Sequence, residues 1–290
     1  VTMQPIDILG VDAAILFSDI LVIPDALGQQ VNFVSGTGPV LKKISSFDDL
    51  KKLTSNNLHN QLKPVYKAIN RIKKELGKFH AETTLIGFAG APWTVATYMV
   101  EGGSSKNYQS IRRWAYEAPD EFSVLIDMLV NTTSDYLIKQ IDSGVEVIQL
   151  FDSWAGVLPP SQFERWVIKP TVKIVDLVRA VHPDTPIIGF PRGAGILYER
   201  FVKETNVDAI SIDSTIPLKW AVEKLQDYCI VQGNLDNIAL LTGGRAMELE
   251  IANILEAFSN GPFIFNLGHG ILPETPVSHV ERLVELVRSA

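Results

Sequence analysis

The chain has 290 residues, a formal net charge of −7 at pH 7, 46% hydrophobic residues and 20% charged residues. This composition is ordinary for a globular protein with a core, and it excludes disordered, collagenous and fibrous chains. The negative charge argues against broad binding to nucleic acids or anionic membranes, although it leaves room for a locally positive cleft.

Cys229 is the single cysteine, so an intrachain disulfide, an iron–sulfur cluster and a multi-cysteine zinc site are excluded, and a reducing cytoplasm is expected. No apolar run is long enough to span a bilayer, and no signal peptide is visible. The sequence begins with Val1 and not with Met. We therefore expect that residues precede it in the natural protein.

Seven short runs rich in Val, Ile and Phe predict β-strands. Each is apolar on both faces, which is typical of parallel strands buried on both sides. They are residues 12–17, 84–88, 145–151, 186–190, 209–212, 228–232 and 263–266.

Helical patterns lie between these runs, with apolar residues three or four positions apart. They are residues 58–76, 119–143, 162–181, 218–226, 245–258 and 277–288. Pro119 suits a first helical turn, and Gly144 suits the position just after a helix. Residues 1–10 resemble a helix tail or loop that leads into a strand.

One segment departs from this alternation. Residues 31–34 and 40–43, with the turn Ser35-Gly36-Thr37-Gly38 between them, predict a hairpin inserted after the first strand.

Alternating strands and helices predict an α/β fold with a parallel sheet, open or closed. A closed (β/α)8 TIM barrel has eight strands and fits one domain of about 250 residues. We interpret residues 1–290 as a single (β/α)8-type barrel domain, N-terminally truncated, whose first strand is missing upstream. A seven-stranded or open sheet is the alternative.

Polar residues and glycines follow almost every predicted strand, where α/β barrels hold their active sites. They are Ser18-Asp19, the segment from Ala89 to Tyr98, Asp152-Ser153, Arg192-Gly193, Asp213-Ser214, Gly233-Asn234 and Gly268-His269-Gly270. We therefore expect a site at this rim.

Each candidate also has a plain structural interpretation. Asp19 is an inward carboxylate or a helix cap, and Asp152 and Ser153 are site residues or loop hydrogen-bonders. Tyr98 is a site residue or ordinary core. Arg192 binds an anion or forms a surface pair.

His269 stands between two glycines, which permit close approach of a ligand. Trp93, Trp154 and Cys229 are expected to pack. The other four histidines carry no ligand pattern.

Two generic functions, that of a phosphate-binding barrel and that of a metal hydrolase, are alternatives for such a rim. The segment from Asn266 to Gly270 follows a late strand, where phosphate-binding barrels hold phosphate, but the motif alone is weak. A metal hydrolase is disfavoured because the sequence has no H-x-H pair and no H-E-x-x-H motif.

Several blocks, in order along the whole chain, resemble the uroporphyrinogen decarboxylase family. They are the block from Asp12 to Leu21, the blocks from Gly87 to Thr94 and Tyr98 to Gly103, the block from Gln149 to Gly156, Gly233 to Asp236, and Asn266 to Pro273. The resemblance implies a homodimeric (β/α)8 barrel of the haem pathway, which decarboxylates the four acetate side chains of uroporphyrinogen. It implies no metal and no organic cofactor.

The resemblance carries four site residues over to this chain: Asp19, Tyr98, Ser153 and His269. Asp19 would bind the pyrrole N–H groups and stabilise a cationic intermediate, and the others would bind substrate carboxylates. Arg192 is our own addition as a further carboxylate donor. The family also opens with an Arg-Gln-Ala-Gly-Arg-Tyr block whose arginines bind carboxylates, and that block is absent here.

Two other classes stay open. A related barrel methyltransferase acting on a thiol or corrinoid needs His and Cys zinc ligands, and the lone Cys229 makes it a poor fit. A non-catalytic tetrapyrrole-binding barrel would bind the ligand without releasing carbon dioxide.

Overall fold

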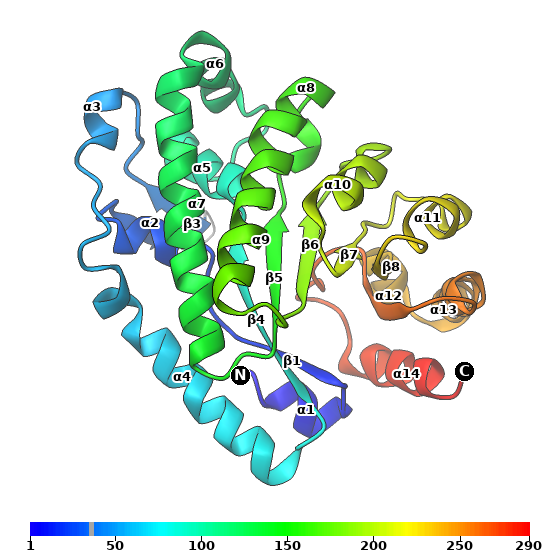
Figure 1. Cartoon of the computed structure of the whole chain (residues 1–290). Helices are drawn as coiled ribbons and strands as arrows, with labels where there is room; N and C mark the ends of the chain where they lie inside the picture. Colours follow the sequence, from blue (N-terminus) through cyan, green and yellow to red (C-terminus); the bar gives the residue numbers. More distant parts are fainter. Residues whose placement is uncertain (35–37) are drawn as a thin grey trace.

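The computed structural model describes residues 1–34 and 38–290, which form a curled parallel sheet with helices on its outer side (Figure 1). The sheet has seven strands in the order β1-β4-β5-β6-β7-β8-β9, and every neighbouring pair is parallel. The strands are β1 (Ala13–Ile15), β4 (Thr84–Gly90), β5 (Val147–Asp152), β6 (Ile187–Pro191), β7 (Ala209–Ser211), β8 (Ile230–Leu235) and β9 (Phe263–Leu267). All seven predicted strands are thus confirmed.

Each strand pairs with the next strand of the sheet in chain order, as in a (β/α)8 barrel. The curl brings the two ends of the described chain together. The guanidinium of Arg288 donates to the carbonyl of Gly10 and lies 3.3 Å from the carboxylate of Asp12.

The two outer strands differ from the expectation that every strand is buried on both faces. Along β1 and β9 exposed residues alternate with more buried ones. Ile15 is 44% exposed and Ile264 is 39% exposed. The reason is that β1 pairs only with β4, and β9 only with β8, so each forms an edge of the sheet.

The predicted hairpin is confirmed as β2 (Val31–Val34) and β3 (Gly38–Leu41), an antiparallel pair separate from the main sheet. The expected turn at Ser35, Gly36 and Thr37 lies outside the described residues. The hairpin docks on the end of α5 (Pro92–Glu101), because the N–H of Leu41 donates to the carbonyl of Gly102 at 3.0 Å.

The helices confirm most of the predicted ones. They are α1 (Gln4–Leu9), α2 (Val22–Ala26), α3 (Phe47–Leu50), α4 (Leu58–Phe79), α5, α6 (Gln109–Glu117), α7 (Pro119–Asp142), α8 (Pro160–Phe163), α9 (Lys169–Val181), α10 (Leu197–Thr205), α11 (Leu218–Leu225), α12 (Asn237–Thr242), α13 (Gly244–Phe258) and α14 (Val277–Arg288). Gly144 follows α7 with φ of 113°, a conformation that suits glycine. Within the described residues, no helix combines the length and apolar character needed to cross a lipid bilayer.

The single helix expected over residues 162–181 is interrupted. A π-helical segment, Glu164–Ile168, separates α8 from α9. Pro170 lies in the first turn of α9 and has no N–H, so it cannot donate to the carbonyl four residues earlier. The N–H of Lys169, the residue before this proline, donates to the carbonyl of Glu164, five residues back.

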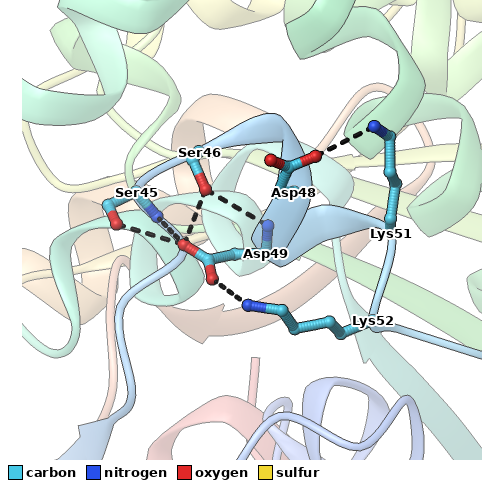
Figure 2. A network of polar contacts seen from close by, with 6 residues as sticks. All are labelled: Ser45, Ser46, Asp48, Asp49, Lys51 and Lys52. Carbon is cyan, nitrogen blue, oxygen red and sulfur yellow. Dashed lines mark hydrogen bonds and ion pairs between the residues drawn. The ribbon is translucent and has the colours of Figure 1, made fainter.

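Short helix α3, which the sequence did not predict, is stabilised by side chains at its start (Figure 2). The hydroxyl of Ser46 accepts from the N–H of Asp49 at 3.2 Å, and the Asp49 carboxylate accepts in return from Ser45 and Ser46. Lys52 lies 2.7 Å from the same carboxylate. The hydrogen bond from Lys52, followed by those from the serines, lowers the pKa of Asp49 well below its usual range.

The core between the sheet and helices α5, α7 and α9 is rich in aromatic side chains. Trp93 is fully buried, as predicted, and its ring meets that of Phe122 edge to face at 6.1 Å. Phe122 packs in the same way against Trp166, at 4.8 Å. This packing fixes the start of α5, the helix that carries Tyr98.

Candidate active site

The parallel sheet places the candidate residues at one rim, because all seven strands end on the same side. Asp19 follows β1, Ser153 follows β5, Arg192 follows β6 and His269 follows β9. Tyr98 reaches the rim from α5, the helix after β4.

Asp19 is half-buried. Its Oδ1 accepts the backbone N–H of Leu21 at 2.7 Å, so the carboxylate is oriented by its own turn. Burial raises the pKa of two phenols, those of Tyr98 and Tyr136, and the negative charge of Asp19 adds to the increase in both. Asp19 therefore interacts electrostatically with both phenols.

Three aromatic rings pack together around Trp154. The ring centroid of Trp154 is 6.2 Å from that of Tyr98 and 5.4 Å from that of Tyr108. Trp154 therefore packs as expected and also lines the site. Tyr108 was missed by sequence reasoning because its segment, between α5 and α6, follows no strand.

Arg192 and His269, which follow β6 and β9, interact electrostatically. Desolvation and the positive charge of Arg192 lower the pKa of His269, and the negative charge of Asp213 partly opposes them. Burial raises the pKa of Tyr108, and the positive charge of Arg192 partly opposes that increase. Within the described residues Arg192 forms no ion pair, so the surface-pair interpretation is wrong there.

Asp152 is a buried carboxyl at the end of β5. Its Oδ1 accepts the hydroxyl of Thr94 at 2.5 Å, and Oδ2 has no hydrogen-bond partner among the described residues. Burial raises the pKa of Asp152 to about 7, and the bonds from Thr94 only partly oppose this. Asp152 is closed off from ligand, since it is 3% exposed.

Ser153 is half-buried between Asp152 and Trp154 in sequence. Its neighbours are fixed, because the hydroxyl of Thr94 accepts the N–H of Trp154 at 3.1 Å and the indole of Trp93 donates to the carbonyl of Trp154 at 3.1 Å. Among the described residues, no hydrogen bond joins Ser153 to the other four candidates. Electrostatic interactions thus connect Asp19 with Tyr98 and Arg192 with His269. Ser153 lies at the same rim without a hydrogen bond to any of them.

The remaining four histidines form ordinary pairs. His59 contacts Tyr66, His80 contacts Asp7, His182 contacts Asp142, and His279 contacts the carbonyl of Leu240. Across residues 1–34 and 38–290, no three His, Cys, Asp or Glu side chains lie together as metal ligands would.

Comparison with known proteins gives one family over the full chain. The family model described as "Uroporphyrinogen decarboxylase (URO-D)" matches residues 1–290. A uroporphyrinogen decarboxylase of Rhodospirillum rubrum is 50% identical over 289 residues, which are 100% of this chain and 82% of the relative. One of Sphingopyxis alaskensis is 51% identical over 288 residues, covering 99% of this chain and 83% of the relative.

Solved structures support the fold. A methyltransferase from Methanosarcina mazei superposes with a TM-score of 0.83 at 20% identity, covering 99% of this chain and 83% of that chain. A B12-independent methionine synthase from Shewanella gives 0.62 at 10% identity, covering 99% and 86%. At these identities the likeness concerns the barrel-type architecture alone.

Proposed function

The chain belongs to the uroporphyrinogen decarboxylase family, a family of carboxy-lyases, and on that basis we propose how its rim performs the reaction. The substrate, uroporphyrinogen, is a flexible ring of four pyrroles with inward N–H groups and outward carboxylates. Loss of carbon dioxide from each of its four acetate side chains leaves a methyl group, and the product is coproporphyrinogen.

The observation that carries the proposal is the accessibility of Asp19. Asp152 and Asp213 also follow strands of the sheet, but they are only 3% and 5% exposed. Asp236 caps α12 through the N–H of Ile238. Asp19 is the half-buried carboxylate of this set and interacts electrostatically with the phenol of Tyr98, so it suits the inward N–H groups of a bound macrocycle.

Arg192, His269, Tyr98 and Ser153 would donate to the outward carboxylates. Arg192 supplies a fixed positive charge, which is the strongest of these donors for an anion. Tyr98 supplies a neutral hydroxyl, because burial raises the pKa of its phenol.

Decarboxylation beside a pyrrole needs an electron acceptor. A proton added to a ring carbon gives a pyrrole cation, and the bond to the carboxylate then breaks so that its electron pair neutralises the cation. The exocyclic carbon takes up a proton and the ring carbon loses one, so each of the four decarboxylations consumes one proton overall. Asp19 would stabilise the cation, an effect typically worth about 3–4 kcal/mol for one preorganised group.

The two edge strands of the sheet, β1 and β9, each have one side free for a further strand among the described residues. β1 and β9 leave Ile15 and Ile264 partly exposed, and the chain covers 82–84% of the length of its curated relatives. We include in the proposal an eighth parallel strand that pairs between these edges. The arginine-bearing strand that the family resemblance describes would add carboxylate donors there.

A homodimer joined at the rims is also part of the proposal. Ile196, Ile238 and Ile271, on segments that follow β6, β8 and β9, are 78%, 53% and 53% exposed. Exposed apolar side chains grouped on one face favour association. A cytoplasmic location agrees with the one free cysteine, Cys229, which is buried.

The test is anaerobic incubation with uroporphyrinogen, with seven- to four-carboxylate products separated by chromatography. Residues 1–290 are assayed alone and joined to the arginine-bearing strand, each with and without Asp19→Asn. We expect turnover by the extended chain and its loss with Asp19→Asn. Tight binding without turnover in both forms would favour the tetrapyrrole-binding alternative.

A further inference from the structure

Asp213 is a fully engaged carboxylate at the end of β7. Its Oδ2 accepts the N–H of Gly193 at 2.9 Å and the hydroxyl of Tyr198 at 3.0 Å. Its Oδ1 accepts the N–H of Thr215 at 3.0 Å and the hydroxyl of the same residue. Four donors thus surround a side chain that is 5% exposed.

These donors keep Asp213 ionised. Burial alone would raise the pKa of the carboxyl, but the hydrogen bonds from Thr215, Gly193 and Tyr198 together outweigh it and hold the pKa below its usual value. Every one of the four donors is a neutral group. The charge of Asp213 is therefore satisfied without an ion pair.

The backbone of Arg192 is fixed beside this carboxylate. Its N–H donates to the carbonyl of Asp152 at 3.1 Å, and its own carbonyl accepts the N–H of Gly156 at 3.0 Å. The next N–H, that of Gly193, is the one bound to Asp213. Gly193 has φ of 76°, and a Cβ at Gly156 would lie only 2.6 Å from its carbonyl oxygen, so these two loops touch through their backbones.

The His269 loop is held against the same strand end. The N–H of Gly268 donates to the carbonyl of Leu235 at 2.8 Å. A Cβ at Gly268 would collide with the backbone nitrogen of Ser214, the residue after Asp213. The side-chain amide of Asn234 donates to the carbonyl of Asp213 at 3.1 Å.

We propose that Asp213 is a positioning residue for the decarboxylation: it holds the Arg192 and His269 loops in place and leaves the Arg192 guanidinium unpaired for a substrate carboxylate. The inference rests on the binding role proposed above for Arg192. Asp213 does not itself touch substrate, because its oxygens are occupied and buried. A carboxylate with fewer neutral donors would attract the guanidinium and compete with the substrate for it.

The test is a double-mutant cycle of Asp213→Asn and Arg192→Gln, with KM and kcat for uroporphyrinogen measured anaerobically. The Asp213→Asn change replaces one acceptor oxygen by an amide nitrogen, which cannot accept the N–H of Gly193. We expect KM to rise about tenfold with Arg192 present and less than about twofold when Arg192→Gln is already in place, with kcat changing less than KM. A dissociation constant for coproporphyrinogen, from anaerobic calorimetry, gives the same comparison without turnover.

Thr215→Val is the second variant, in case Asp213→Asn lowers the yield of folded protein. It removes the hydroxyl donor to Oδ1 and frees that oxygen to attract Arg192, so KM should rise and the rise should vanish with Arg192→Gln. If the effects of Asp213→Asn and Thr215→Val on KM are instead additive with the effect of Arg192→Gln, the positioning role of Asp213 is wrong. An unchanged KM in Arg192→Gln alone would instead overturn the proposed binding role of Arg192.

Discussion

The hydroxyl of Thr94 on α5 donates to Oδ1 of Asp152 on β5 across 2.5 Å, and the same hydroxyl accepts the N–H of Trp154. One buried side chain thus connects a helix to the strand end beside it. Tyr98 lies one helical turn after Thr94, and Ser153 lies between the two residues that Thr94 binds. The relative placement of these two proposed substrate donors therefore depends on the Thr94–Asp152 bond.

Asp152 should make stability depend on pH in an unusual direction. Its pKa is about 7 in the folded chain against 3.8 for the free carboxyl, so the folded state keeps a proton that the unfolded state has lost. Stability therefore falls as the pH rises from about 4 to about 7. Between pH 5 and pH 8 the loss is roughly 2–3 kcal/mol.

Asp152→Asn removes this titration and keeps an acceptor for Thr94. The free energy of unfolding of the variant, measured relative to the wild type by urea unfolding, should be higher at pH 8 than at pH 5 by roughly 2–3 kcal/mol. Asp213→Asn is the matched control. The pKa of Asp213 is lowered in the folded state, so its contribution to stability is constant from pH 5 to pH 8 and is lost only at more acid pH. Equal pH dependence in both variants would contradict the assignment.

Asp19→Asn should lower kcat by about 10²–10³-fold, because the neutral amide cannot stabilise the pyrrole cation. The chromatographic assay measures this loss. Asp25→Asn is the control, since Asp25 is an exposed carboxylate on the neighbouring helix α2 and should leave kcat within about twofold. Near-normal turnover by the Asp19→Asn variant would remove the central carboxylate from the mechanism.

Tyr98→Phe should raise KM by roughly tenfold, the usual cost of a lost hydrogen bond to a charged group. Ser153→Ala should have a smaller effect, below about fivefold, because no hydrogen bond within the described part of the chain orients its hydroxyl. KM values from the same assay rank the two. A larger loss for Ser153→Ala than for Tyr98→Phe would reverse their proposed roles.

His269 should titrate below the usual histidine range, and NMR of the ring protons measures its midpoint. Arg192→Gln should move the midpoint upward, because a positive charge that disfavours the imidazolium is removed. Asp213→Asn should move it downward, because the favourable negative charge is lost. His269→Gln assigns the signal among five histidines. Shifts in the same direction for both variants would contradict the arrangement of the three charges.

The strands could be predicted well because each is a short run of β-branched and aromatic residues. Their periodicity could not show that β1 and β9 form edges, since Ile15 and Ile264 resemble core residues until their pairing is known. The π segment before α9 was missed for a related reason. The apolar spacing continues across Pro170, and only the hydrogen-bond register changes there.

The sequence predicted where the site residues lie, at the rim of the sheet, but not the hydrogen bonds that connect their loops. The family resemblance supplied Asp19, Tyr98, Ser153 and His269, and Arg192 was added because it follows a predicted strand. The role inferred for Asp213 could not be predicted, because two of its partners, Gly193 and Tyr198, lie in the segment after β6, 15 to 20 residues before it. An aspartate directly after a buried strand was the available signal, and by sequence alone it is only one more rim residue.

The contact between Arg288 and Gly10 joins residues 278 positions apart. On the ribosome, the segment that carries Gly10 and Asp12 therefore emerges long before the helix that binds it. Contacts between neighbouring strands form locally as each is made, whereas this contact closes a loop of nearly the whole described chain and carries a correspondingly high loop-closure entropy. This contact thus forms only after α14 has been synthesised, when every strand of the described sheet is already available for pairing.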